Sequence, residues 1–233
     1  MTGLESLKTQ DRLLGNQAAN SIRRQIVNGI MPPGHRLLET SLAASLEVSR
    51  GTIRSALMQL TTEGLVSQVA FTKWEVAPAS VYEAWELYTL RAALEGLAAR
   101  LAAERATPES RVQLENAYAE LERAAKTEIR EEIIDADFNL HRVLVGMSGH
   151  GRLVREHEKL IQQVRFQMTH IGLTARDYSH LLKDHRALKD AVVKGDAEKA
   201  AELAASHNSA EVERLLADST SERSAETGRQ KPG

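Results

Sequence analysis

Two short helical patterns separated by a tight turn stand out in the distribution of apolar residues between positions 37 and 76. In the second pattern, residues spaced by three and four form one apolar stripe, which consists of Ile53, Ala56, Leu57 and Leu60. Ser49 precedes this helix as an N-cap, and Gly64 follows it as a residue suited to the C-terminal cap. A shorter helical pattern begins at about Glu39. The pair predicts a helix-turn-helix.

The residues on either side extend this motif. Residues 16–28 form another amphipathic pattern, and alternating residues at 65–69 and 74–77 predict two short strands. Three helices and a two-stranded hairpin make a winged helix. The exposed face of its second motif helix and the wing carry the candidates for DNA contact, which are Ser49, Arg50, Thr52, Arg54 and Lys73. Arginine can bind guanine bidentately. The alternative is a small helical hairpin with a solvated basic face.

Helical patterns fill the rest of the chain after Pro78. They are predicted at 81–104, 107–126, 129–147, 151–171, 178–194 and 197–217. Short connections between these helices predict an α-helical bundle. In the first of them, the expected buried stripe is Leu87, Leu90, Leu94, Leu97, Ala98 and Leu101.

The fold class is therefore mainly α, with a winged helix-turn-helix at 16–78 and an all-α bundle of about six helices at 79–217. Residues 1–15 are expected to form a flexible N-terminal arm, and 218–233 a disordered tail, because both segments are polar and lack apolar periodicity.

Composition limits the function classes. The chain has no Cys, which excludes disulfides and thiolate metal sites. No apolar run reaches membrane-spanning length and the N-terminus lacks a signal-peptide core, so we expect a cytoplasmic protein without a membrane partner. The net charge of −2 does not by itself indicate a nucleic-acid partner. Residues 1–77 are slightly basic, with eight Lys/Arg against six Asp/Glu.

A carboxylate and three imidazoles in the bundle form a candidate metal site. Asp137 and His141 are four residues apart and share one helix face, whereas His185 and His207 lie on later helices. This donor set suits zinc, nickel, manganese or iron and leaves positions open for water or an anion. On spacing alone, the alternative is a group of surface histidines, because the chain has eight.

The segment PPGHRLLETSLAASLEVSRGTIRSALMQLTTEGLV closely resembles the winged helix-turn-helix of the GntR family, over about residues 20–77. Two departures from the family pattern matter. Glu47 stands where the turn usually has Gly, which costs about 1 kcal/mol if the backbone is left-handed there. Thr72 and Lys73 stand where the wing usually has Gly after a basic residue, so Lys73 could supply a phosphate contact instead.

The segments DADFNLHRVL and DHRALKDAVVKGDAEKAAELAASH resemble the FCD effector domain of FadR-type GntR regulators, over about residues 82–216. The resemblance implies a metal ion, with zinc as the first candidate, that is bound by Asp137, His141, His185 and His207. It also implies that Arg91 faces an effector pocket. A salt bridge from Arg91 to Glu95 is the alternative. Arg165 and His170 are further candidates for effector contact.

These observations predict a metabolite-responsive transcription regulator, not an enzyme. We expect a homodimeric repressor of a catabolic operon that binds a pseudo-palindromic DNA operator and senses a small carboxylate or related metabolite. One alternative is a metal-dependent hydrolase or lyase that uses the Asp/His cluster, but the sequence has no HExxH motif and no nucleophile at a telling spacing. Another is a DNA-binding protein with a purely structural metal.

Overall fold

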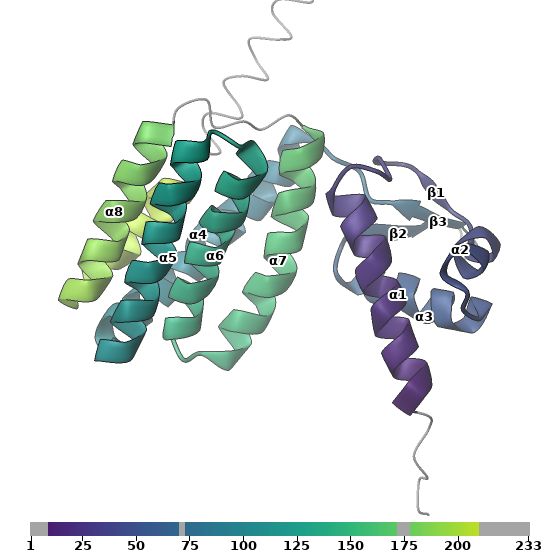
Figure 1. Ribbon diagram of the computed structural model, residues 1–233, viewed down its shortest axis with the longest axis horizontal. Helices are drawn as coiled ribbons and strands as arrows, with labels where there is room; N and C mark the ends of the chain where they lie inside the picture. Colours follow the sequence, from purple (N-terminus) through teal and green to yellow (C-terminus); the bar gives the residue numbers. More distant parts are fainter. Residues whose placement is uncertain (1–8, 70–72, 172–177, 210–233) are drawn as a thin grey trace, which may run out of the picture. The chain divides into compact units, whose positions relative to one another are not determined.

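The computed structural model describes residues 9–69, 73–171 and 178–209 (Figure 1). These residues are mainly helical and divide into two compact units. The first unit contains the described residues up to Ser80 together with 162–171, and the second contains 81–161 and the described residues from 178 onward. No helix in the described ranges is long and apolar enough to cross a membrane.

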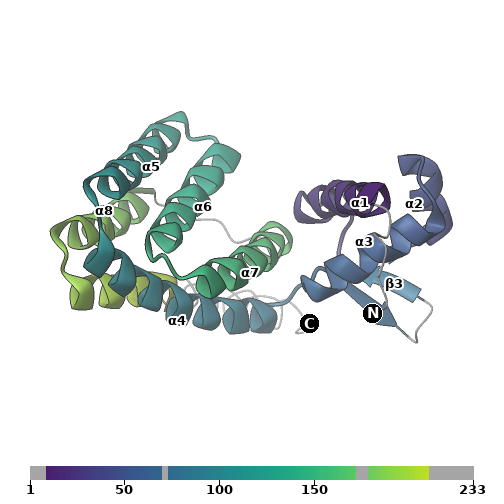
Figure 2. The same ribbon diagram turned by 90° about the horizontal axis from the view of Figure 1, so that it is seen from below.

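The first unit combines three helices with a small sheet. Its elements are α1 (Thr9–Val27), β1 (Arg36–Leu37), α2 (Glu39–Leu46), α3 (Arg50–Thr62), β2 (Val66–Val69) and β3 (Lys73–Val76). The antiparallel strands are ordered β1-β3-β2. Helix α1 packs against α3 (Figure 2). The core includes the predicted apolar stripe of α3, since Ile53, Ala56, Leu57 and Leu60 are all fully buried.

The structure differs from the sequence prediction at two places in this unit. Helix α1 begins at Thr9 instead of residue 16, so residues 9–15 are helical, and the rest of the expected arm lies outside the described residues. The predicted two-stranded wing is part of a three-stranded sheet, because β1 pairs with β3. A strand of two residues is too short to produce a recognisable alternation, so the sequence could not reveal it.

The predicted helix caps of this unit are confirmed. The Oγ of Ser49 accepts a hydrogen bond from the backbone N–H of Thr52 at 3.0 Å, and Gly64 has a left-handed backbone with φ of 73°. Glu47, which follows α2, is left-handed as well, with φ of 53° and ψ of 40°. Because a side chain at such a position clashes with the backbone, Glu47 carries strain where glycine would not.

Replacing Glu47 with Gly is therefore expected to stabilise the first unit by about 1 kcal/mol, since only the backbone strain is removed. The measurement is thermal unfolding beside Glu47→Ala, a control that also removes the charge but keeps a Cβ. Equal stability of the Gly and Ala variants would show that backbone strain at this turn is negligible.

The second unit is a helical bundle. Its elements are α4 (Val81–Arg105), α5 (Pro108–Thr127), α6 (Arg130–Met147), the first part of α7 (Gly151–His170), α8 (Tyr178–Lys194) and a helical segment at 197–209. The predicted start of α5 is confirmed, because Thr107 precedes Pro108 as the N-cap and forms a capping box with Ser110. Helices α4 and α5 each pack against α6 and α8, and α8 lies at the outer edge of the bundle in Figure 1.

The predicted leucine stripe of α4 is wrong in detail. Leu90 and Leu97 are 52% and 46% exposed, and only Ala98 of the stripe is fully buried. The buried face instead consists largely of small residues together with Tyr88, Arg91 and Glu95. Small side chains let neighbouring backbones approach closely, so this helix buries its alanines and leaves leucines at the edge of its contact.

Candidate metal centre and DNA-contacting surface

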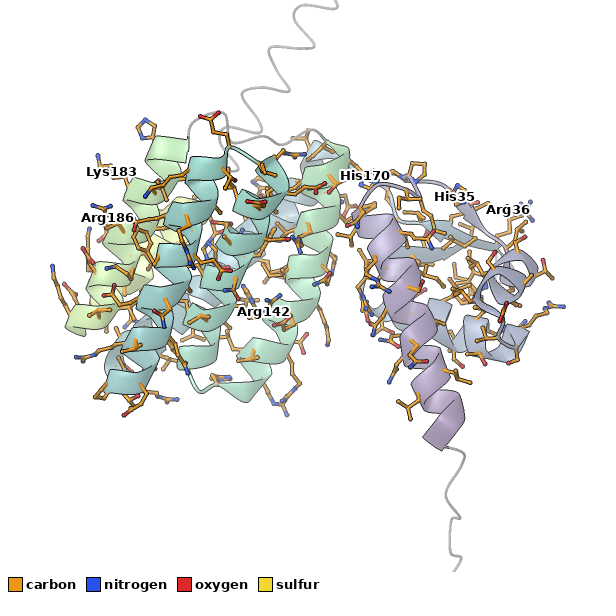
Figure 3. The ribbon with its side chains drawn as sticks, in the orientation of Figure 1. His35, Arg36, Arg142, His170, Lys183 and Arg186 are labelled. Atoms are coloured by element: carbon orange, nitrogen blue, oxygen red, sulfur yellow. The ribbon has the colours of Figure 1, made fainter. Side chains whose placement is uncertain are left out.

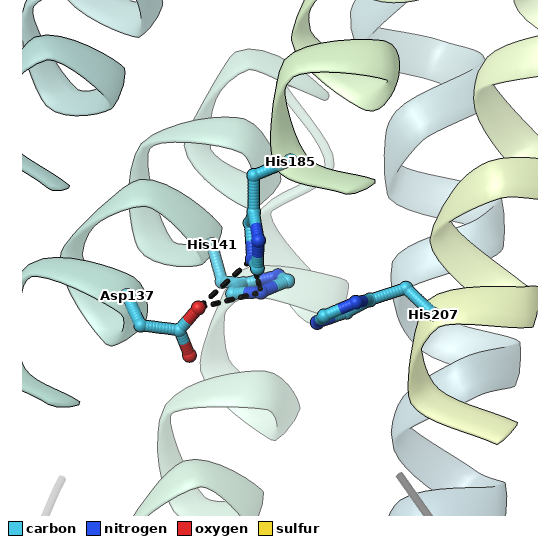
Figure 4. A group of neighbouring side chains, drawn as sticks. All are labelled: Asp137, His141, His185 and His207. Carbon is cyan, nitrogen blue, oxygen red and sulfur yellow. Dashed lines mark hydrogen bonds and ion pairs between the residues drawn. The ribbon is translucent and has the colours of Figure 1, made fainter. Parts of the chain in front are cut away.

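Four side chains from three helical segments converge in the second unit (Figure 4). Asp137 and His141 come from consecutive turns of α6, His185 from α8, and His207 from the helical segment at 197–209. One donor atom of each lies within 4.8 Å of the others. His141 and His185 are fully buried, whereas the side chain of Asp137 is 16% exposed. The structure thus brings together all four predicted ligands.

Neighbouring acceptors orient two of the imidazole rings. Nδ1 of His185 lies 2.7 Å from the carbonyl oxygen of Leu181, and Nδ1 of His141 lies 2.8 Å from Oε2 of Glu95, at ion-pair distance although not aligned as a hydrogen bond. An acceptor beside Nδ1 favours the tautomer that carries its proton there. The Nε2 atom of each ring then presents a lone pair to the cluster.

These donor atoms are as close as the ligands of one ion. The two Nε2 atoms of His141 and His185 are 3.0 Å apart, and Oδ1 of Asp137 lies 2.8 Å from Nε2 of His185. Ligand bonds of about 2.0–2.2 Å to zinc place donors at such separations. Among the described residues, Oδ1 of Asp137 and Nδ1 of His207 receive no aligned hydrogen bond although both are buried. A divalent cation would satisfy these atoms, so the donor set fits a metal ion.

The charges within the cluster shift its pKa values in different directions. Burial alone would raise the pKa of Asp137, but His185 and His141 hold it well below its ordinary value. Burial lowers the pKa of His185, yet the Asp137 carboxylate outweighs this and leaves the pKa raised. Burial, followed by the charges of His185 and His141, holds the pKa of His207 well below its usual range. Asp137 is thus an anion, and His207 is neutral and able to bind metal.

A buried carboxylate, Glu95, connects the cluster to three further buried side chains. Its Oε1 accepts from Nε of Arg91 at 2.7 Å and lies 2.8 Å from Nε2 of His157, and its Oε2 accepts from Nδ2 of Asn208 at 2.8 Å. All four side chains are at least 97% buried. Oε2 also contacts the metal-cluster residue His141. Glu95 therefore neutralises Arg91 and fixes a predicted ligand at the same time.

The structure bears on one of the two predictions for Arg91, the salt bridge, and the effector-facing role stays a prediction. The salt bridge to Glu95 is present, but it engages Nε, and the buried Nη2 has no hydrogen-bond partner among the described residues. The positive charge of Arg91 is felt by all four cluster residues, because it contributes to each of their pKa shifts. Arg91 thus lies beside the cluster with unused hydrogen-bonding capacity.

Sequence reasoning missed the contact of Glu95 with His141, and it missed His157 and Asn208 altogether. The only signal was a charged pair, Arg91 and Glu95, inside an alanine-rich helix pattern. That pattern also fits a solvated surface pair. His157 and Asn208 come from other helices, and nothing in their local sequence indicates that they reach Glu95.

Arg165 and His170 lie on α7. Both belong to the part of α7 that groups with the first unit. Nδ1 of His170 bonds the carbonyl oxygen of Phe166 at 2.8 Å, and Phe166 is part of the core of that unit. Burial lowers the pKa of Arg165. Their contact with an effector stays a prediction.

In the first unit, the predicted DNA-contacting residues lie at the N-terminal end of α3 and on the wing. Arg50, Arg54 and Lys73 are exposed, and Thr52 is half-buried. The hydroxyl of Ser49 is engaged as the N-cap and lies 2.8 Å from that of Thr52. The unpaired N–H groups at this helix end add to the positive potential of the arginines, which favours phosphate binding.

A hollow of about 640 Å³ lies beside these residues and is lined by four cationic side chains. Besides Arg50, Arg54 and Lys73, it includes Arg36 on β1, which projects from the edge of the first unit (Figure 3). Sequence reasoning missed Arg36 because the strand that carries it was not predicted. The one acidic residue in the lining is Glu39.

This fold is a winged helix-turn-helix joined to a helical domain with a His/Asp cluster, and family comparisons identify both parts. Residues 14–70 match the model of the bacterial regulatory proteins of the gntR family, and residues 86–210 match the FCD domain. The chain belongs to the GntR family of transcription regulators with an FCD domain. It is a regulator and not an enzyme.

Individual relatives agree with this assignment. The chain is 34% identical over 134 residues to the Nta operon transcriptional regulator of Aminobacter aminovorans, a match that covers 58% of this chain and 63% of that protein. It is 28% identical over 207 residues to the galactonate operon transcriptional repressor of Escherichia coli, covering 79% and 89%. The structure of E. coli McbR/YncC has the same fold, with a TM-score of 0.70, 23% identity and coverage of 88% and 98%.

Proposed function

We propose that this protein is a homodimeric repressor of a catabolic operon whose operator binding is controlled by a small carboxylate that binds beside a metal ion. The observation that carries the proposal is the buried Nη2 of Arg91, which has no partner among the described residues and lies next to a four-ligand cluster. The guanidinium fork and an open metal position are together suited to the two ends of a carboxylate ligand.

The charges of the site support an anionic effector. With neutral histidines, Arg91 contributes one positive charge, and Glu95 and Asp137 contribute two negative charges. A divalent ion on Asp137 and the histidines would leave the buried site with a net positive charge. Buried charge is costly unless it is paired, so an anion would complete the balance. The galactonate repressor, among the relatives, is named for an operon of a sugar acid.

The proposed metal is zinc, with nickel, manganese or iron as alternatives. Three imidazoles and one carboxylate bind each of these ions and leave further positions open. The proposed ligands are Asp137, His141, His185 and His207. Glu95 would act behind them by holding the ring of His141, as carboxylates commonly do for metal-bound histidines.

A homodimer would explain the exposed apolar face of α4. The large side chains on that face are Tyr82, Trp85, Leu90 and Leu97, which are 39–64% exposed. Large apolar side chains that are exposed together on one helix are typical of an interface. Two-fold symmetry would place two α3 helices on a pseudo-palindromic operator, with Ser49, Arg50, Thr52, Arg54 and Lys73 as the proposed contacts. A regulator of this kind acts on DNA in the cytoplasm.

The carboxylate site is tested by calorimetric screening of small organic acids against the zinc-loaded protein and its Arg91→Lys variant. Lysine keeps the charge beside Glu95 but lacks the planar fork. For an acid that binds wild type, we expect about tenfold or greater loss of affinity in the variant, because a hydrogen bond between charged groups is lost. Zinc affinity, measured in parallel, should not change. Equal acid affinity in the two proteins would remove Arg91 from the effector site.

A further inference from the structure

Glu39 occupies the junction of three elements of the first unit. It is the first residue of α2, and its side chain is only 12% exposed. The indole Nε1 of the buried Trp74, on β3, donates a hydrogen bond to its Oε1 at 3.2 Å. Thirty-five residues separate the two positions, so only the fold brings them together. The carboxylate of Glu39 is therefore anchored by Trp74 of the wing strand β3.

The open side of this carboxylate holds the predicted reading residue Arg54 of α3. Nε of Arg54 donates to Oε1 at 2.9 Å and Nη2 donates to Oε2 at 3.0 Å, a paired geometry that fixes the guanidinium plane. Nη2 of Arg50 lies 3.4 Å from Oε2 of Glu39. Both arginines are otherwise largely exposed, at 59% and 64%. Glu39 thus holds the side chains of Arg54 and Arg50 in defined positions, although both are largely exposed to solvent.

The side-on pairing with Glu39 leaves the Nη1–Nη2 edge of the Arg54 guanidinium available to bind DNA. A guanidinium has five N–H donors, and the bonds to Glu39 use those of Nε and one of Nη2. The end formed by Nη1 and Nη2 points away from the carboxylate. That end can bind O6 and N7 of guanine bidentately. A fixed side chain loses less conformational entropy when it makes such a contact.

Two roles for an acid on a DNA-facing surface must be distinguished. Glu39 could compete with phosphate for the arginines and weaken binding to all DNA equally. It could instead aim Arg54, which would favour the correct base over others. The Trp74 bond and the low exposure argue against a mobile competitor. The hydrogen bond from Arg54 also contributes most to lowering the pKa of Glu39 to about 2, so the carboxylate is ionised at neutral pH.

We propose that Glu39 is a positioning residue for operator recognition, which holds Arg54 end-on toward the base edge and is itself anchored by Trp74. This inference rests on the proposed role of Arg54 in reading the operator. It assigns sequence discrimination to a residue that does not need to touch DNA. Glu39 should therefore matter for the ratio of operator affinity to random-DNA affinity more than for either affinity alone.

The test uses a duplex that the wild-type protein selects from a random library, and a random-sequence duplex of equal length. Binding of both is measured for wild type, Glu39→Asp, Glu39→Gln and Arg54→Ala. Aspartate keeps the charge but is one methylene too short to hold Arg54 and reach Trp74 together. We expect the operator-to-random ratio to fall about tenfold in both Glu39 variants, because a good bidentate base contact loses its alignment. Glu39→Gln should also bind random DNA more tightly.

The outcomes separate this inference from the role of Arg54. If Glu39→Gln tightens binding to both duplexes equally and Glu39→Asp changes neither, Glu39 is only a competitor and the inference is overturned. If Arg54→Ala retains the wild-type ratio, the role of Arg54 and the inference both fail. If Arg54→Ala loses the ratio while folded Glu39→Asp keeps it, only the inference fails. Thermal unfolding of each variant identifies any that does not fold, and Trp74→Phe then serves as the second variant, with the same expected loss of ratio.

Discussion

Replacing His207 with alanine is expected to abolish stoichiometric metal binding. Wild-type protein should carry about one divalent ion per chain, because four donor atoms converge within 4.8 Å. Loss of a direct ligand should lower zinc affinity by more than about 100-fold, since loss of an outer-shell partner alone typically costs 10–100-fold. Elemental analysis of the purified proteins measures the stoichiometry, and chelator competition measures the affinity.

Thermal unfolding provides a second readout of the same prediction. A ligand at about 100 times its dissociation constant adds about 2.7 kcal/mol to the stability of a folded protein. Zinc should therefore raise the unfolding temperature of wild type and leave that of His207→Ala unchanged. The metal-free variant should remain folded, because it loses only a neutral ring whose Nδ1 has no partner among the described residues.

The matched control for His207→Ala is His180→Ala, which removes an exposed histidine from α8, the helix that also carries His185. The control should bind metal like wild type. The metal centre would be contradicted if wild type bound no zinc, manganese or nickel after each was added. It would also be contradicted if His207→Ala kept one ion per chain at wild-type affinity.

Replacing Arg54 with alanine is expected to lower operator affinity by about 100-fold. A bidentate arginine contact to guanine contributes about 1–3 kcal/mol of discrimination. The variant additionally leaves the carboxylate of Glu39 unpaired by Arg54 on the DNA-facing surface, where it repels phosphate. Fluorescence anisotropy with the selected duplex, at stated salt, measures the loss.

Arg24→Ala is the matched control for Arg54→Ala, because it removes an exposed arginine of the same unit from α1. Both variants lower the charge equally, so general electrostatic attraction changes by a similar amount. Only Arg54→Ala should lose operator preference. Wild-type operator affinity in folded Arg54→Ala would mean that another element reads the bases.

Local sequence signals were sufficient to predict much of the first unit. The apolar stripe of α3, the Ser49 cap and the glycine at position 64 each depend on neighbours only a few residues away. The two-residue strand β1 was not predictable because it is defined by its pairing with β3, far along the chain. The same limit explains why the sequence indicated that Arg54 is an exposed candidate for DNA contact but did not indicate that Glu39 pairs with it.

The candidate metal site was predictable in part for a different reason. Asp137 and His141 share one face of α6 by spacing alone, but their association with His185 and His207 came from the resemblance to a family. The hydrogen bonds around Glu95 were not predictable, because Glu95, His157 and Asn208 belong to three different helices. The spacing of the leucines in α4 predicts the wrong buried face, because it is mainly the alanines of this helix that are buried against neighbouring helices.

The central claim is that metal and metabolite together control DNA binding. It is tested most directly by titrating the selected operator duplex with protein in four states: metal-free, zinc-loaded, and each with a saturating acid from the calorimetric screen. We predict that operator affinity changes at least about fivefold only when zinc and the acid are both present, as allosteric coupling typically amounts to 1–3 kcal/mol. Operator affinity that stays the same in all four states, while calorimetry shows the acid bound, would contradict the account and leave the metal a structural role.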